Sequence, residues 1–200
     1  MIQVLDDLHN PRQRVLDAAE ALFMQRGYNA IALRDIADAL GIKQASLYYH
    51  FPGGKEELYV AVAERVFANH YAGVAEALKG ETLEEQLHAV AEWFAGQRQI
   101  CLLGMIHADL PALQPQHTQS VQMAAMMGIF RPLSEAFGAA MTRGEIVQHN
   151  PHLLAGAFLS LLDGLMIAQL MGNAPDRSAV AGQLISVLLD GVRPRKPAWA

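Results

Sequence analysis

The stretch from Ala32 to Lys55 restricts the possible folds of this chain more than any other part of the sequence. Four apolar residues recur near its start at helical spacing: Leu33, Ile36, Ala37 and Leu40. Gly41 ends that helix, because glycine readily takes the left-handed conformation that follows many helix C-termini. A second helix is predicted from Lys43 to His50. The sequence therefore predicts two short helices joined by a tight turn.

Two helices joined in this way form a helix-turn-helix, in which the second helix lies in the major groove of DNA. The net charge of −5 argues against a nucleic-acid partner. However, the segment from Arg12 to Lys55 holds six Lys or Arg and four Asp or Glu, a net charge of +2, and the acidic excess lies elsewhere. This distribution is compatible with DNA binding. Because the positive excess is small, affinity should depend on two subunits binding together.

The composition indicates a soluble globular protein. Of the 200 residues, 52% are hydrophobic, which is enough to bury a core. The one cysteine, Cys101, excludes an internal disulfide and favours a cytoplasmic location. We expect no secretory signal, since the first residues lack an apolar core. The most apolar segment, Leu153 to Met171, contains Asp163, so we expect a buried or interface helix there and not a membrane span.

Helical signals continue along the whole chain, and no segment shows the sustained alternation of a β-strand. Asn10 and Pro11 predict the start of a first helix, which Gly27 ends. The run Phe51-Pro52-Gly53-Gly54 interrupts the chain, and a long connector helix is predicted from Lys55 to about Leu78. The predicted fold class is all-α, with a three-helix helix-turn-helix head over residues 1–54 and a helical bundle over residues 55–200.

The bundle is predicted to contain further helices, which capping signals and apolar spacing delimit. They begin at a Thr82 capping box and continue over Ile100 to Asp109, Gln116 to Arg143, Asn150 to Met171, and Asp176 to Asp190. The longest of them has a predicted inward face made of Met123, Met127, Phe130, Leu133, Phe137 and Met141.

Short motifs follow one another between Arg12 and about Leu58 in a specific order: Gly27, Ile36-Ala37, Leu40-Gly41, Leu47-Tyr48-Tyr49-His50-Phe51 and Lys55-Glu56. In this order and at these distances they resemble the N-terminal head of the tetracycline-repressor-type (TetR) transcriptional regulators. The chain departs from that pattern at Ala32, where the family often has a Thr or Ser cap, and in its additional glycine after Pro52. The resemblance implies a homodimer, a DNA-binding head and a body that responds to a small molecule. No cofactor is expected.

Nine residues of the head are predicted to contact DNA: Arg34, Lys43, Gln44, Ala45, Ser46, Tyr48, Tyr49, His50 and Lys55. Gln44 and Ser46 can hydrogen-bond to base edges, and the Ala45 methyl group can contact a thymine methyl group. The resemblance implies that Tyr48 lies near bases and that its two successors contact phosphates. Lys55 and Arg34 are further phosphate candidates. Alternatively, these residues are a solvated surface, and the Tyr49 ring packs into the head. Leu47 is expected in the core.

A ligand cavity in the body would be lined by apolar and adaptable side chains. The candidates are Trp93, Cys101, Met105, His107, Met123, Met126, Met127 and Phe130, with His107 and Asp109 as a possible polar handle. The alternative for each of them is ordinary core packing. No spacing among the histidines and the cysteine matches a metal motif, so no metal is expected. The last two helices are expected to form the dimer interface through Phe158, Leu161, Leu162, Leu165, Leu184 and Leu188.

The function predicted from these features is a ligand-responsive repressor that binds a palindromic operator as a dimer and leaves it when a small, mostly apolar molecule binds. The alternative is a DNA-binding protein of the same type without a small-molecule inducer, either an activator or a protein-regulated factor. An enzyme is not expected, because no Ser-His-Asp order, paired-carboxylate helix motif or phosphate loop is visible.

Overall fold

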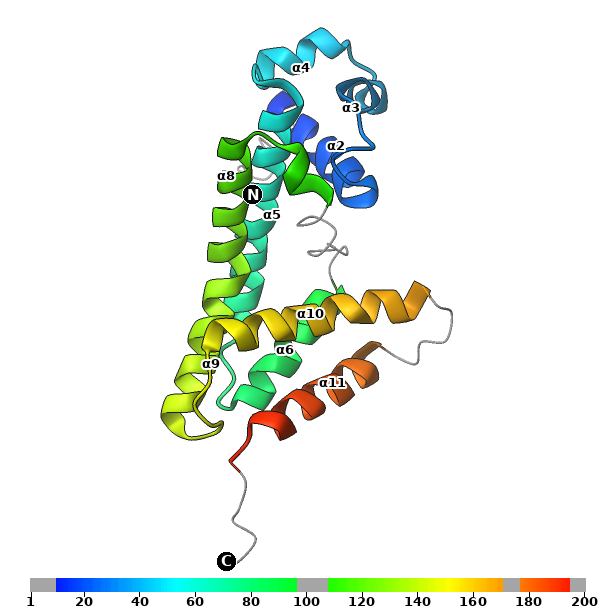
Figure 1. The fold of residues 1–200 in the computed structure, drawn as a ribbon. Helices are drawn as coiled ribbons and strands as arrows, with labels where there is room; N and C mark the ends of the chain where they lie inside the picture. Colours follow the sequence, from blue (N-terminus) through cyan, green and yellow to red (C-terminus); the bar gives the residue numbers. More distant parts are fainter. Residues whose placement is uncertain (1–9, 97–107, 171–176, 195–200) are drawn as a thin grey trace, which may run out of the picture. The chain divides into compact units, whose positions relative to one another are not determined.

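The computed structural model describes residues 10–96, 108–170 and 177–194, and every regular element in these ranges is helical (Figure 1). This confirms the all-α fold class. The described residues form two compact units, one of residues 10–66 and 108–124, the other of residues 67–96, 125–170 and 177–194. A division after residue 54 would cut the first unit. The assignment of DNA binding to residues 1–54 and of ligand binding to residues 55–200 stays a prediction.

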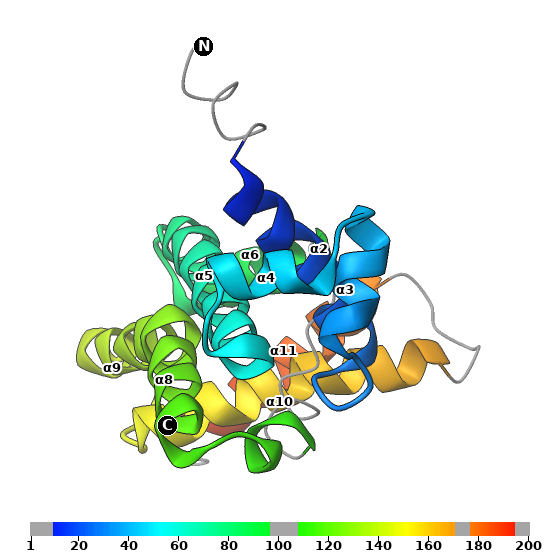
Figure 2. The same cartoon turned by 90° about the horizontal axis from the view of Figure 1, so that it is seen from above.

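The first unit begins with α2 (Pro11–Arg26), α3 (Leu33–Leu40) and α4 (Gln44–His50). The Asn10 side chain accepts the backbone N–H of Arg12 at 3.0 Å, which confirms the predicted N-cap. The first unit also contains the start of α5 (Gly54–Ala77), the short 3₁₀ helix η2 (Leu110–Ala112) and most of α8 (Pro115–Ala125). Helix α3 lies across α4, as the turn between them requires (Figure 2).

The turn between α3 and α4 is made by Gly41, whose φ of 66° and ψ of 32° lie in the left-handed region. Glycine takes this conformation at little cost because it has no Cβ. At the other end of α3, Ala32 has no side-chain acceptor to cap the helix. The Asp35 carboxylate nevertheless accepts the Ala32 N–H at 2.7 Å, which supplies one half of a capping box.

The core of the first unit is built from one apolar face of each of its helices. Helix α2 contributes Val15, Leu16, Ala19 and Phe23, and the following elements add Ile31, Ile36, Leu47, Phe51, Leu58 and Val62, all at most 5% exposed. Arg65 of α5 also pairs with two carboxylates of α2, Asp17 at 2.7 Å and Glu20 at 2.6 Å. The predicted apolar face of α3 is confirmed at Leu33, Ile36 and Ala37, and Leu40 is half-buried.

The second unit contains the end of α5, α6 (Leu83–Gly96), α9 (Arg131–Arg143), α10 (Pro151–Leu170) and α11 (Arg177–Val192). Helix α10 packs on α9 and on α11, which also packs on α6. Leu87, Leu133, Phe137, Leu154 and Ile185 are among its buried side chains. The Thr82 capping box is confirmed, since Thr82 Oγ1 accepts the Glu85 N–H and the Glu85 carboxylate accepts the Thr82 N–H, each at 3.2 Å.

One helix was predicted from Gln116 to Arg143, and the structure divides this run with a π-helical turn, η3 (Met126–Phe130), between α8 and α9. Such a turn inserts one extra residue into the helix. The residues before it therefore point in other directions than they would in a continuous α-helix. The inward face is confirmed at Leu133, Phe137 and Met141. It is wrong at Met123 and Met127, which are 55% and 46% exposed.

None of the helices in the described part of the chain is long and apolar enough to span a membrane. Asp163, which interrupts the most apolar segment, is buried in α10. This agrees with the expectation that the segment is a helix of the body.

Candidate nucleic-acid interface

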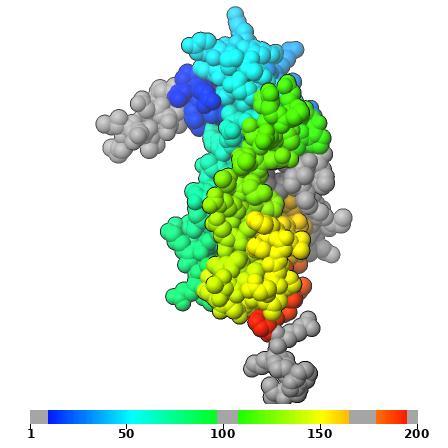
Figure 3. Space-filling view, turned by 60° about the vertical axis from the view of Figure 1, so that its left-hand side comes forward, coloured from blue at the N-terminus to red at the C-terminus, as the bar shows by residue number. Residues whose placement is uncertain are grey.

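Helix α4 is anchored by one buried side chain and exposes nearly everything else. Leu47 is 1% exposed, which confirms its predicted place in the core. Four residues at the start of α4 are exposed: Lys43, Gln44, Ala45 and Ser46. Figure 3 shows α4 on the outer surface of the first unit. An exposed N-terminal half on a firmly held helix is the arrangement that allows side chains to reach base edges.

The two tyrosines of α4 both face outward. Tyr48 is 47% exposed and Tyr49 is 85% exposed, so the alternative in which the Tyr49 ring packs into the head is wrong. The Tyr49 ring meets the His50 ring edge-on, with 5.1 Å between their centroids. Both rings are therefore free to meet a partner, as the sequence predicts for contact with DNA.

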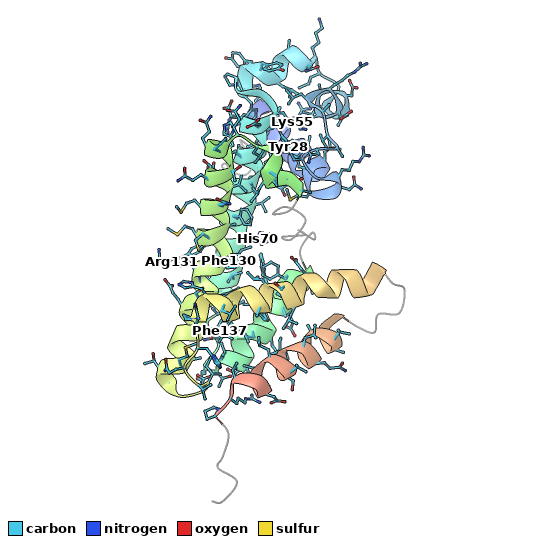
Figure 4. The ribbon with its side chains drawn as sticks, viewed as in Figure 1. Tyr28, Lys55, His70, Phe130, Arg131 and Phe137 are labelled. Carbon is cyan, nitrogen blue, oxygen red and sulfur yellow. The ribbon has the colours of Figure 1, made fainter. Side chains whose placement is uncertain are left out.

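The two phosphate candidates differ in their surroundings. Arg34 is well exposed, and its Nε lies 3.6 Å from a carboxylate oxygen of Asp38 one turn later in α3. The Lys55 ammonium, in contrast, lies 3.9 Å from the centre of the Tyr28 ring, a cation–π contact (Figure 4). Burial lowers the pKa of Lys55, and the negative charges of Asp109 and Asp35 partly offset this effect. Lys55 is therefore not an ordinary solvated surface charge.

The sequence analysis did not predict that the Asp109 carboxylate joins separate elements of the first unit. Asp109 was considered as a polar handle for a ligand beside His107. Its carboxylate instead accepts the Tyr28 N–H at 2.9 Å and the Tyr59 hydroxyl at 3.0 Å, and it is buried. No local signal could have shown this, because the partners are 81 and 50 residues away in sequence.

A second polar contact joins the same two parts of the chain. Glu56 in the first turn of α5 accepts the backbone N–H of Gln114 at 3.1 Å and contacts Nδ1 of His117 at 2.5 Å. The contact with His117 lowers the pKa of Glu56, with a smaller effect from the Gln114 N–H, against the opposing effect of burial. Together with Asp109, this contact fastens residues 108–117 to the head.

The structure describes five of the eight predicted ligand residues. Cys101, Met105 and His107 lie outside the described residues. Met123, Met126 and Met127 are about half exposed. Trp93 and Phe130 belong to the second unit, in which Trp93 packs edge-on against His70 at 5.0 Å and leaves no room for a side chain at Gly73. Sequence reasoning missed His70, whose buried ring also meets Phe94 at 5.4 Å.

The predicted dimer-interface residues differ in how far they are exposed. Phe158 is 1% exposed, so the prediction that it packs against a partner is wrong, because its own unit already covers it. Leu161, Leu162, Leu184 and Leu188 are half-buried, and the side chain of Leu165 lies outside the described ones. Two apolar residues that were not predicted are far more exposed, namely Leu153 of α10 at 68% and Val187 of α11 at 71%.

No group of three His, Cys, Asp or Glu side chains in the described residues is placed to hold a metal ion.

A family model described as bacterial regulatory proteins of the tetR family matches residues 15–62. Over 84 residues the chain is 42% identical to the HTH-type transcriptional activator FasR of Mycolicibacterium smegmatis, which covers 42% of this chain and 38% of that protein. Over 131 residues it is 30% identical to the HTH-type transcriptional repressor KstR2 of Mycobacterium tuberculosis, covering 60% of this chain and 53% of the repressor. The chain thus spans about two fifths to one half of these two relatives.

Solved structures share the fold over most of the chain. The tetR-family regulator PfmR of Thermus thermophilus superposes with a TM-score of 0.68 at 25% identity and covers 88% of this chain and 97% of PfmR. NemR of E. coli in its reduced form gives a TM-score of 0.74 at 20% identity, covering 94% of this chain and all of NemR. A third structure, AibR in complex with isovaleryl coenzyme A and operator DNA, gives 0.70 at 20% identity and covers 90% of this chain and 98% of AibR.

Proposed function

Because the chain belongs to the tetR family of bacterial regulatory proteins, we propose that it is a transcriptional repressor that binds a palindromic operator as a dimer. We further propose that a small, mostly apolar molecule releases it. The observation that carries the DNA-binding part is the contrast within α4, where Leu47 is buried and the residues on both sides of it are exposed.

In this proposal α4 lies in the major groove and its exposed start reads the sequence. Gln44 can bond bidentately to adenine, and Ser46 can donate to or accept from several bases. Tyr49, His50 and Lys55 contact phosphates and fix the position of the helix, with Arg34 as a further contact from α3. The small positive charge of the head makes these directional contacts more important than general attraction to DNA.

The dimer would form through α10 and α11, in an arrangement in which each subunit uses the same surface. Exposed apolar side chains support this choice, since Leu153 and Val187 lie on these two helices and Leu161 and Leu184 are partly exposed beside them. Two heads related by a two-fold axis would bind two half-sites one helical turn apart or slightly more, which is why a palindromic operator is proposed.

Release by a ligand is supported by features of the second unit. His70 is a buried polar residue among the rings of Phe67, Trp93 and Phe94, and the π-helical turn occurs in the same unit. Turns of this kind are frequent at functional sites. A structural neighbour was solved with an acyl coenzyme A and operator DNA. A ligand acts only as far as its affinity differs between the DNA-bound and released states.

An activator is the second candidate, because FasR is named as one. A reporter gene placed behind the bound site separates the two, since deletion of a repressor raises expression and deletion of an activator lowers it.

The proposal is tested with a random-sequence DNA library. The wild-type protein should enrich a palindromic duplex, and Tyr48→Ala with Lys55→Ala should abolish binding in a gel shift while the dimer persists in size-exclusion chromatography. The control is Tyr71→Ala, which removes an exposed tyrosine of the second unit. Unchanged binding by the double variant would refute the assignment of the interface. Retained binding with every metabolite tried would count against release by a ligand.

A further inference from the structure

A group of polar and aromatic side chains lies beside Lys55 and is absent from the proposed DNA contacts. It consists of Tyr28, Tyr59 and Asp109, which we call the Asp109 cluster. We propose that Asp109 is a positioning residue of the DNA-binding head: its carboxylate fixes Tyr28 and Tyr59, and through Tyr28 it fixes the Lys55 side chain for contact with a DNA phosphate. This inference rests on the proposed function, since it requires Lys55 to bind DNA.

The Asp109 carboxylate uses its two oxygens for two different parts of the head. Oδ1 accepts the backbone N–H of Tyr28, in the connection between α2 and α3, and Oδ2 accepts the hydroxyl of Tyr59 in α5. Both bonds are buried. A buried carboxylate is costly without such donors, and bonds to a charged acceptor are stronger than neutral ones. One side chain therefore ties the connection that leads into α3 to the helix that carries Lys55.

The aromatic rings extend this link from Asp109 to the lysine. The Tyr59 ring packs edge-on against the Tyr28 ring, with 5.0 Å between centroids, and Phe23 packs edge-on against Tyr59 at 5.2 Å. The Lys55 ammonium lies over the Tyr28 ring, 3.9 Å from its centre. Figure 4 labels both residues. A free lysine side chain loses much rotational entropy when it binds a phosphate. A lysine that already rests on a fixed ring loses less, which favours binding.

The negative charge of Asp109, like its hydrogen bonds, favours phosphate binding by Lys55. Burial against Tyr28 lowers the pKa of Lys55, and the negative charge of Asp109 opposes this effect more than that of Asp35 does. The charge of Asp109 therefore favours the ammonium form of Lys55, the form that pairs with a phosphate.

The fit of Asp109 against the head is close. Gly27 has a φ of 76°, and a Cβ atom added there would lie 3.1 Å from Oδ1 of Asp109. Gly27 therefore serves two purposes, since it ends α2 and leaves space for the carboxylate. Next to it, the Asn29 side chain donates to the carbonyl oxygen of Ala108 at 2.8 Å, which holds the segment around Asp109 against the same connection.

A double-mutant cycle on operator affinity tests this inference. The probe is the duplex that the wild-type protein enriches from a random library, and binding is measured by fluorescence anisotropy on folded protein, checked by circular dichroism. We expect Lys55→Ala to weaken binding about tenfold and Asp109→Ala about fivefold. If Asp109 acts through Lys55, then Asp109→Ala made in Lys55→Ala protein should weaken binding less than about twofold.

Tyr59→Phe provides a second, milder variant in case Asp109→Ala does not fold. It removes one hydrogen bond and keeps the ring, so it should weaken binding about twofold in wild-type protein and have no effect in Lys55→Ala protein. The matched controls are Tyr71→Phe and Glu92→Ala, which change exposed residues of the second unit outside α10 and α11 and should leave affinity unchanged.

Two results would overturn the inference. One is wild-type affinity in both Asp109→Ala and Tyr59→Phe, and the other is an equal loss with and without Lys55, which a purely structural role would produce. Failure of the proposed function gives a different result, because the wild-type protein would then enrich no duplex at all.

Discussion

Polar contacts join distant parts of the chain in both units. In the first unit Asp109 joins Tyr28 and Tyr59, and Arg65 joins α2 and α5. In the second unit Glu145 accepts the Leu83 N–H, and two glycines allow close approach, Gly73 to the Trp93 ring and Gly128 to the backbone of Phe67. Directional polar bonds suit a head that must present fixed side chains to DNA.

The largest expected effect concerns the buried anchor of the reading helix. Leu47→Ala removes a fully buried side chain, so the free energy of unfolding should fall by about 3 kcal/mol, measured by urea denaturation. Tyr49→Ala is the matched change on the exposed side of α4. It should leave stability within about 0.5 kcal/mol of wild type and weaken DNA binding. Equal losses of stability in both variants would contradict this division of the helix.

The next effect tests close packing in the second unit. In Gly128→Ala the new Cβ would lie 2.4 Å from the carbonyl oxygen of Phe67, so the backbone must shift, and stability should fall by about 2 kcal/mol. Gly138→Ala in α9 is the control, because a Cβ there meets nothing within 4 Å. This control should gain up to about 1 kcal/mol from the better helix propensity of alanine. Thermal melts of the two variants shifting in the same direction would refute the packing argument.

One carboxylate in each unit should make stability depend on pH. Contacts lower the pKa of Glu56 through His117 and the Gln114 N–H, and that of Glu145, against the effect of burial, through the Leu83 N–H and Arg143. A folded-state pKa below the unfolded value means that the stabilisation is present above about pH 4.5 and is lost as the pH falls through the folded-state pKa. Glu56→Gln and Glu145→Gln should each cost about 1 kcal/mol at pH 7 and less at pH 3.

The exposed Glu92 provides the control for this pH dependence, since Glu92→Gln should change the denaturation midpoint equally little at both pH values. If Glu56→Gln instead lost as much stability at pH 3 as at pH 7, the contact with His117 would not be the cause.

The smallest effects concern helix starts, where the two units also differ. The second unit has a complete capping box at Thr82 and Glu85, and α3 in the first unit has only the half that Asp35 supplies. Ala32→Ser adds the missing acceptor and should raise stability by about 0.5 kcal/mol, while Thr82→Ala should lower it by about 1 kcal/mol. A loss of melting temperature in Ala32→Ser would show that the Ala32 backbone cannot accept this cap.

Local patterns predicted much of the fold because the interactions behind them are local. Asn10 and Thr82 are helix caps, Gly41 makes the turn before α4, and Leu47 faces the core, all as helical spacing and capping rules predict. The π-helical turn was not predictable in this way, because nothing in the sequence Met126–Phe130 marks it, and it displaced Met123 and Met127 from the inward face. Phe158 was predicted at the dimer interface because helical spacing identifies an apolar face. It does not show whether that face is buried within the subunit or exposed.

The sequence by itself determined that this chain is helical, where its helix-turn-helix lies, and to which family its motifs point, because these depend on residues within a few turns of each other. Only the tertiary structure decided how Lys55 is held. Lys55 rests on Tyr28, which Asp109 binds together with Tyr59. The partners in these two hydrogen bonds are separated by 81 and 50 positions in the sequence, so no periodic pattern reveals them. The fold brings such groups together because a buried carboxylate is stable only where the chain supplies it with donors.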